Sequence, residues 1–210
     1  MREERPFSVL LGTDGAGKSS VMGRLAPLLP EWQLISVDST LVAPQHALIT
    51  RLRKDLQDYL LPGLGTVYSP DFLASVLQTA VVHLRDQVLA RDPRAPMLVD
   101  SYYYKILAKC RMAGVQDSRI YSWWRSFPQP DQVVFLDVSA ESAWRRRGDG
   151  AQLNVLEYDG ATADWEGFER YQKNLRKLLL EEVGELPVTI LREQPDADRA
   201  ADAVRKVLTA

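Results

Sequence analysis

The most constraining feature of the sequence is a glycine-rich segment that joins a short apolar run to a helical pattern. The segment reads Gly12-Thr13-Asp14-Gly15-Ala16-Gly17-Lys18-Ser19, after apolar residues 7–11 and before helical residues 18–29. Glycines at these spacings let backbone N–H groups curl round phosphate oxygens, and the start of a helix adds partial positive charge. A strand, a loop and a helix in this order predict a phosphate-binding loop.

We expect this loop to bind ATP together with Mg²⁺. The residues predicted to hold the nucleotide are Gly12, Asp14, Gly15, Ala16, Gly17, Lys18, Ser19 and Ser20. Lys18 is expected to reach the β- and γ-phosphates, and the Ser19 hydroxyl is expected to ligate Mg²⁺. Asp14 and Lys18 are also candidates for a catalytic role. The alternative is a glycine-rich turn that happens to precede a helix and a lysine.

Short apolar runs alternate with longer helical stretches along the chain. The expected strands are residues 7–11, 32–37, 97–99, 132–138 and 188–191. The expected helices are residues 18–29, 46–60, 70–90, 102–112, 118–124, 140–147, 165–183 and 197–208. This alternation favours a parallel sheet with crossover helices, and the chain length of 210 residues favours one domain. The prediction is a single three-layer α/β/α domain over residues 1–210.

Composition argues against several classes of protein. A net charge of −2 gives no general attraction to nucleic acid, and no apolar stretch approaches the roughly 20 residues that span a bilayer. The single cysteine, Cys110, cannot form an internal disulfide, which fits a reducing compartment. The charged N-terminus does not have the pattern of a signal peptide. We therefore expect a cytoplasmic protein that binds neither nucleic acid nor membrane.

Asp100 is the first carboxylate outside the loop that we single out. It follows the predicted strand 97–99, whose carboxyl end is expected beside the phosphate loop. An acid at this position can hold the water shell of Mg²⁺ or accept a proton from the attacking group. The alternative is an aspartate that caps the helix expected to begin near Tyr102. We predict Ser19 and Asp100 as the metal-binding pair.

A run of three arginines, Arg145 to Arg147, precedes an irregular stretch that is rich in glycine and acids. Guanidinium groups suit the negative charge that develops during phosphoryl transfer. Neighbours on a helix lie about 100° apart, so the three side chains cannot all face one point. We take Arg145 and Arg147 as catalytic candidates and expect the rest to face solvent. The alternative is a solvated basic end of a helix.

The phosphate loop resembles that of thymidylate kinases, whose characteristic form carries Asp-Gly-Ala-Gly-Lys. Residues 133–141 with the arginines that follow are similar to the fourth strand and the start of the lid in that family. Residues 168–180 resemble the helix after the lid. The resemblance implies a five-stranded parallel sheet of order 2-3-1-4-5, a mobile lid near residues 145–163 and a homodimer.

The chain departs from the family on the acceptor side. The family has an arginine where Ser101 stands, and Val37-Asp38-Ser39-Thr40 replaces its Arg-Glu-Pro. Residues 75–78 replace its Asp-Arg pair, and Asn154 to Glu157 reduce its lid element. A dianionic nucleoside monophosphate needs cations in a partly dry site. Either other arginines substitute for them, or the acceptor is not a standard monophosphate. The arginines available for this are Arg51, Arg53, Arg111 and Arg125.

Asp38 and two aromatic clusters bear on the acceptor. Asp38 resembles the position where deoxynucleoside kinases place the carboxylate that activates a sugar hydroxyl, so it is a catalytic candidate. The alternative is a loop aspartate before Ser39. Residues 102–104, all tyrosine, and the tryptophans 123 and 124 either stack on a base or pack in the core.

We therefore expect an ATP-dependent kinase that transfers the γ-phosphate to a small molecule, a nucleoside monophosphate or a nucleoside-like acceptor. Two alternatives stay open. The acceptor is a non-nucleotide metabolite, or the chain is a regulatory protein that binds nucleotide without turnover.

Overall fold

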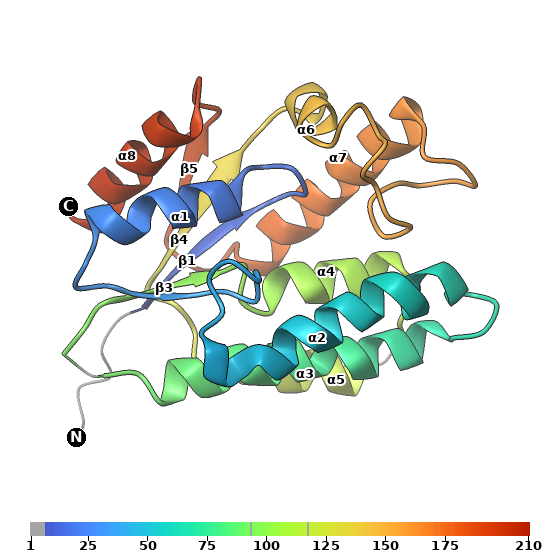
Figure 1. The fold of residues 1–210 in the computed structure, drawn as a ribbon, viewed down its shortest axis with the longest axis horizontal. Helices are drawn as coiled ribbons and strands as arrows, with labels where there is room; N and C mark the ends of the chain where they lie inside the picture. Colours follow the sequence, from blue (N-terminus) through green and yellow to red (C-terminus); the bar gives the residue numbers. More distant parts are fainter. Residues whose placement is uncertain (1–6, 93, 117) are drawn as a thin grey trace.

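Five strands form one parallel sheet in the computed structural model, which describes residues 7–92, 94–116 and 118–210 (Figure 1). The strands are β1 (Phe7–Gly12), β2 (Gln33–Ile35), β3 (Met97–Asp100), β4 (Gln132–Asp137) and β5 (Val188–Arg192). Their order across the sheet is β2-β3-β1-β4-β5, and every neighbouring pair is parallel. The predicted order 2-3-1-4-5 is confirmed.

Helices cover both faces of this sheet (Figure 1). They are α1 (Lys18–Leu28), α2 (Ala47–Asp55), α3 (Pro70–Leu89), α4 (Tyr104–Met112), α5 (Ser118–Arg125), α6 (Ala140–Arg146), α7 (Trp165–Glu182) and α8 (Ala197–Leu208). Helices α1 and α8 pack on one face, and α3, α4, α5 and α7 pack on the other. The predicted three-layer α/β/α architecture is confirmed. No helix in the described part of the chain is both long enough and apolar enough to span a membrane.

The core has two parts because successive strand residues point to opposite faces. In β1, Val9 and Leu11 join the larger cluster with α3, α4, α5 and α7. Leu10 points the other way and joins the cluster that contains α1 and α8. All three side chains are fully buried. Burial on both faces explains why the strands are almost continuously apolar rather than alternating.

The segment predicted as one helix over residues 46–60 is more irregular than expected. A short 3₁₀ turn (Pro44–His46) leads into α2, which ends at Asp55. A π-helical turn (Leu56–Leu60) and a second 3₁₀ turn (Leu61–Gly63) follow. Apolar periodicity does not distinguish these turn types from an α-helix, because each of them is only about one turn long.

Strand β2 is also shorter than the predicted residues 32–37. It ends before Ser36, whose hydroxyl donates to Asp100 Oδ2 and accepts from the Asp38 N–H. These side-chain hydrogen bonds turn the chain away from the sheet. As a result Asp38 lies just beyond the carboxyl end of β2, in contact with Ser19 of the phosphate loop.

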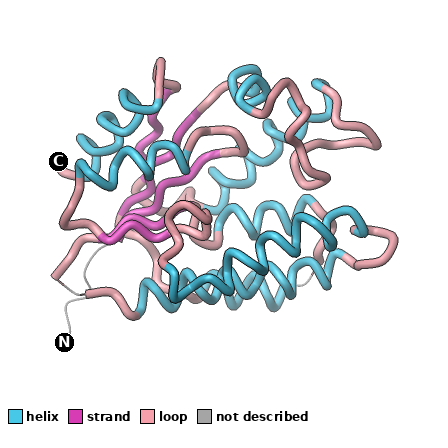
Figure 2. The backbone as a smooth tube through the Cα atoms, in the orientation of Figure 1, coloured by secondary structure: helices cyan, strands magenta, loops and turns pink. Residues whose placement is uncertain are grey.

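The segment between α6 and α7 is mostly loop (Figure 2). It matches the irregular stretch that was predicted to follow the arginines 145–147. Asp164 caps the start of α7 by accepting a hydrogen bond from the Gly167 N–H at 2.7 Å. Motion of the segment between α6 and α7 as a lid stays a prediction, and so does the homodimer.

Candidate active site

The predicted phosphate loop connects β1 to α1 in a tight curl. Gly15 and Gly17 have φ angles of 72° and 87°, which favour glycine. Gly15 also lies against α6, where an added Cβ would be 3.0 Å from atoms of Ala143. Lys18 Nζ donates to the carbonyl oxygens of Gly12 and Thr13 at 2.8 and 3.0 Å. The loop therefore folds back round the lysine that the sequence assigns to the phosphates.

The loop borders a cavity of about 700 Å³, a size typical of small-molecule sites. All the predicted nucleotide-binding residues line it except Gly12, whose carbonyl contacts Lys18 from behind the loop. A Cβ on Gly12 would lie 2.9 Å from the carbonyl oxygen of Leu136. Gly12 thus serves the close approach of the loop to β4, and the other predicted residues face the cavity.

The surroundings of Lys18 disfavour the positive charge of its side chain. Burial, together with the nearby ammonium group of Lys105, lowers its pKa to about 7. Asp100 and Asp14 act in the opposite direction. A desolvated lysine that faces a second lysine is a strong site for an anion, because negative charge placed there relieves both effects.

Two carboxylates meet the loop at the cavity. Asp38 Oδ2 accepts from Ser19 Oγ at 2.9 Å, and Asp38 Oδ1 accepts from the N–H and hydroxyl of Thr40. Burial opposes ionisation, but these hydrogen bonds and the charge of Arg53 hold the pKa of Asp38 below its usual range. Asp38 is therefore a carboxylate at neutral pH, beside the hydroxyl predicted to bind Mg²⁺.

Asp100 lies at the end of β3 and also lines the cavity. Its two carboxylate oxygens accept from Ser36 Oγ at 2.9 Å and from Ser101 Oγ at 2.8 Å. Asp100 does not cap a helix, which was the alternative interpretation, because Tyr103 is the N-terminal capping residue of α4. The structure thus brings Ser19, Asp38 and Asp100 to the same end of the cavity.

These oxygen groups fit Mg²⁺. Within the described ranges, no group of three or more His, Cys, Asp or Glu side chains could hold a metal ion. Mg²⁺ does not need such a group, because it keeps several waters and is usually bound through one or two carboxylates and substrate phosphates. The hydroxyl of Ser19 and the carboxylates of Asp38 and Asp100 form a donor set of this kind.

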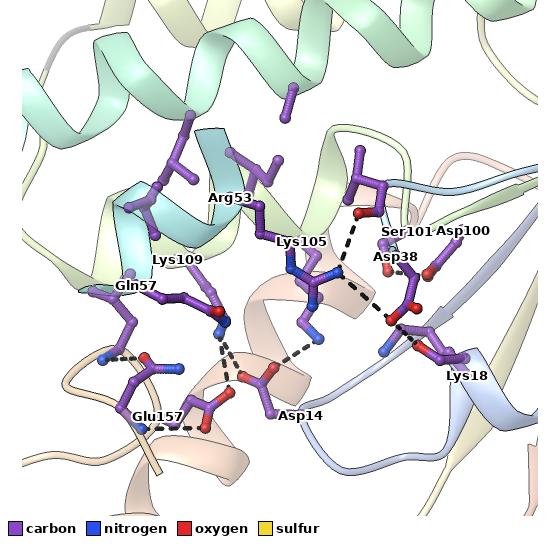
Figure 3. Close-up of a pocket in the computed structure, with 18 of the residues that line it drawn as sticks. Asp14, Lys18, Asp38, Arg53, Gln57, Asp100, Ser101, Lys105, Lys109 and Glu157 are labelled. Atoms are coloured by element: carbon purple, nitrogen blue, oxygen red, sulfur yellow. Dashed lines mark hydrogen bonds and ion pairs between the residues drawn. The ribbon is translucent and has the colours of Figure 1, made fainter. Parts of the chain in front are cut away.

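A buried ion cluster beside the loop was not predicted from the sequence. The carboxylate of Asp14 lies between Lys105 Nζ at 2.7 Å and Lys109 Nζ at 2.8 Å (Figure 3). Burial opposes ionisation, but these two lysines hold the pKa of Asp14 far below its usual range. Lys109 also approaches Glu157 at 4.0 Å, and Arg147 pairs with the same glutamate. The cluster joins the loop, α4 and the segment after α6.

The turn between β3 and α4 aims these lysines at the loop. Ser101 and Tyr102 have φ angles of 60° and 45°, uncommon for residues other than glycine. Helix α4 consequently begins at Tyr104 and not at the predicted residue 102. Lys105 and Lys109 are four residues apart and share one helix face. The signal available in the sequence was this spacing of two lysines on a helix that follows Asp100, a candidate site residue.

The arginines among residues 145–147 that line the cavity differ from those predicted. Arg146 donates to the carbonyl of Gly15 at 3.3 Å, and both Arg146 and Arg147 line the cavity. Arg145 is exposed, donates to Ser142 Oγ and does not reach the cavity, which corrects its assignment as a site residue. The phase of α6 decides this, because one residue of offset turns a side chain by about 100°.

Of the four arginines considered as substitutes on the acceptor side, Arg53 alone reaches the cavity. Its guanidinium donates to the carbonyl of Val37 at 3.1 Å and lies 3.5 Å from Asp38 Oδ2. Arg111 and Arg125 both bind Glu182 on α7. Arg51 is exposed and does not line the cavity.

The aromatic clusters mostly pack in the core. The three consecutive tyrosines and Trp124 are buried, which confirms the packing interpretation for them. Trp123 is half-exposed and contacts Phe127 and Arg85. Tyr102 is the one aromatic residue among the described residues that line the cavity.

Comparison with known proteins identifies similar sequences. No protein-family model matches the chain. A thymidylate kinase from Akkermansia muciniphila is 30% identical over 159 residues, which cover 74% of this chain and 73% of that protein. A probable thymidylate kinase from Archaeoglobus fulgidus is 26% identical over 204 residues, which cover 94% and 91% of the two chains.

Solved structures share the fold. A thymidylate kinase from Candida albicans has a TM-score of 0.63 at 14% identity, with 98% of this chain and 91% of that chain covered. A deoxyadenosine kinase from M. mycoides, with dCMP and dCDP bound, has a TM-score of 0.64 at 14% identity, with 97% and 98% covered. At this level of identity the likeness concerns the fold alone.

Proposed function

The chain belongs to the thymidylate kinase family, and we propose that it transfers the γ-phosphate of ATP to a small nucleotide or nucleoside-like acceptor. Its relatives are kinases, which supports phosphotransferase activity of the nucleotide-kinase type. The donor, the metal and the residues named below are parts of the proposal.

One observation carries this proposal. Lys18 and Ser19 of the phosphate loop meet the carboxylates of Asp38 and Asp100 at one end of a cavity of about 700 Å³. The same cavity thus offers cations for the phosphates, oxygen ligands for Mg²⁺ and room for a second molecule. A phosphate-binding turn without catalysis requires the first of these but not the other two.

The chemistry follows from the placement of charge. Backbone N–H groups of the loop and the start of α1 hold the donor phosphates, while Lys18 and Lys105 balance the charge of the transferred group. Ser19 and the two carboxylates would hold Mg²⁺, which would neutralise negative charge on the donor phosphates. The acceptor oxygen forms a bond to the γ-phosphorus as the bond from that phosphorus to ADP breaks. Arg146, the last residue of α6, donates to the carbonyl of Gly15 in the loop, and both Arg146 and Arg147 line the cavity.

A coupled assay of ADP release tests the proposal. Purified protein with ATP and Mg²⁺ is offered nucleoside monophosphates, nucleosides and sugar-like alcohols, one at a time. We expect acceptor-dependent ADP release that Lys18→Met removes and that Lys173→Met, at an exposed lysine of α7, leaves in place.

The alternative functions give different results in the same assay. A regulatory protein would bind ATP but release no ADP with any acceptor. A kinase for a non-nucleotide metabolite would show turnover that thymidine monophosphate neither supports nor inhibits. Equal ADP release by the wild type and Lys18→Met would refute the assignment of the site.

A further inference from the structure

We propose that the contact between His46 and His83 is a pH-sensitive device that holds helix α2 against α3 while both imidazoles are neutral. The two rings meet edge to face, with centroids 4.8 Å apart and planes at 61°. His46 ends the 3₁₀ turn before α2, and His83 lies on α3. This pair lies outside the phosphate site, and its role does not depend on the reaction proposed above.

Helix α2 depends on such a contact because it has few other anchors. None of its residues is fully buried, and its N-terminus has no side-chain cap. Its C-terminal half is tethered through Arg53, which donates to the carbonyl of Val37. Helices α2 and α3 lie side by side (Figure 1), and the two histidines join the start of α2 to α3. A segment with little buried surface is easily released from the rest of a fold.

The pair stands next to one wall of the cavity. Ile49 follows His46 by about one turn of α2, and it lines the cavity. On α3, Ala80 and Leu84 lie on either side of His83 in the sequence, and both line the cavity too. Release of the start of α2 from α3 would therefore displace this wall.

A proton on either imidazole weakens the contact. Both rings are half-buried. Burial and the neighbouring His46 lower the pKa of His83, while the carboxylate of Asp86 opposes them. An imidazolium at His46 would also lie at the N-terminus of α2, where the helix carries partial positive charge. Two protonated rings would repel each other across the contact.

The charged neighbours compensate for this only in part. On α3, Asp86 acts on His83, but it also pairs with Arg85 at 2.7 Å. On the 3₁₀ turn and the first turn of α2, His46 is the one titratable residue of the sequence 44–50, and the next charged residue, Arg51, is exposed. The surroundings of the pair therefore favour neutral imidazoles.

The direction of the pH effect follows from this. The folded-state pKa of His83 lies below its ordinary value, so a state with α2 released takes up protons more readily. The stabilisation from the contact is present above the ordinary pKa of about 6.5 and is lost as the pH falls from there through the folded-state pKa. We expect α2 to be held at neutral pH and released in mild acid.

Proton NMR tests the pair directly. The chain has two histidines, so each single variant identifies the signal of the other imidazole. We expect the Hε1 signal of His83 to titrate at a lower pH in the wild type than in His46→Gln. A titration of His83 that His46→Gln leaves unchanged would overturn the proposal.

Hydrogen exchange read by mass spectrometry tests whether the contact holds α2. Rates are corrected for the effect of pH on the intrinsic chemistry of exchange. From about pH 7.5 to about pH 5.5, the protection of residues 47–55 should fall about fivefold in the wild type, the lower end of a typical coupling between two sites. The protection of α8, which packs on the other face of the sheet, should stay unchanged.

A variant with both His46→Phe and His83→Phe is the matched control. It keeps two flat rings at the contact, but neither ring can take up a proton. In this variant the protection of α2 should not change over the same pH range. An equal loss in the variant and the wild type, or no loss in the wild type, would overturn the proposal.

The cavity supplies a readout of its own. The KM for the acceptor in the wild type, divided by that in the doubly substituted variant, should rise about fivefold over the same pH range. Taking this ratio at each pH cancels the titration of the acceptor and of Lys18. A constant ratio would overturn the link between the histidine contact and the cavity. Absence of turnover with every acceptor would refute the proposed function, and the exchange experiment would still decide the role of the histidines.

Discussion

Replacing Asp14 by asparagine tests the buried ion cluster on which the geometry of the loop depends. The substitution keeps the size of the side chain and removes its charge. Asp14 is 6% exposed, and its partners Lys105 and Lys109 are 18% and 14% exposed. Asparagine would leave two partly buried ammonium groups that repel each other, with Glu157 at 4.0 Å from Lys109 as partial compensation.

The magnitude follows from this burial. Removing one partner of a buried ion pair destabilises a protein by about 3–5 kcal/mol, and the partial exposure of both lysines favours about 3 kcal/mol. With a urea dependence of about 2 kcal/mol per molar, the unfolding midpoint should fall by about 1.5 M. Urea titrations followed by circular dichroism measure this shift.

A surface ion pair provides the control. Asp137 binds Arg176 through two hydrogen bonds of 2.7 and 2.9 Å, but both side chains are substantially exposed. Asp137→Asn should therefore cost only about 0.5 kcal/mol. Equal losses in the two variants would refute the reasoning that burial makes the Asp14 cluster important.

The effect of Asp14→Asn also has a predicted dependence on pH. The folded-state pKa of Asp14 lies below its unfolded value, so the unfolded state binds the proton more readily. The stabilisation is therefore present above the unfolded pKa of about 4 and is lost as the pH falls through the folded pKa. The difference between the wild type and the variant should shrink below about pH 4.

Three further predictions concern the phosphate loop and its neighbours. Because the pKa of Lys18 is lowered to about 7, its side chain should take up close to one proton when ATP binds at about pH 8.5. Calorimetry in buffers of different ionisation enthalpy measures this uptake. Lys18→Met should abolish it. Lys105→Met should lower kcat by about 100-fold in steady-state assays, and an effect as small as that of Lys173→Met would contradict its role at the phosphates. Gly15→Ala should cost about 1–3 kcal/mol in urea unfolding, because φ is 72° and α6 is too close for a Cβ. Gly23→Ala, where a Cβ meets nothing within 4 Å, should instead stabilise α1 by up to about 1 kcal/mol, and a loss there would contradict the steric argument.

The layers of this fold could be predicted from the sequence because the signals are local. Apolar runs such as residues 133–136 and the strand–loop–helix context of the phosphate loop locate the sheet and its carboxyl edge. The order of the strands came from the resemblance, since no local pattern states which strand lies beside which. Asp100 could be placed near the loop because it ends a strand of the same sheet, whereas Asp38 was singled out by its resemblance to the carboxylate of deoxynucleoside kinases.

The rest of the site depends on backbone geometry that periodicity does not contain. The left-handed turn at Ser101 and Tyr102 sets the phase of α4, and so decides that Lys105 and Lys109 face Asp14. The phase of α6 likewise selects Arg146 in place of Arg145. In both helices a shift of one residue would have given a different set of cations at the cavity.

The function proposed for this cavity is the transfer of the γ-phosphoryl group of ATP to a second molecule. The most direct measurement uses ATP labelled in the γ-phosphate, with Mg²⁺ and the acceptor that best stimulates ADP release, followed by separation of the products. We predict that the label leaves ATP and appears in the acceptor with the wild type, and that Lys18→Met gives no labelled acceptor. Label recovered only as inorganic phosphate, or equal labelling by the variant, would contradict the account.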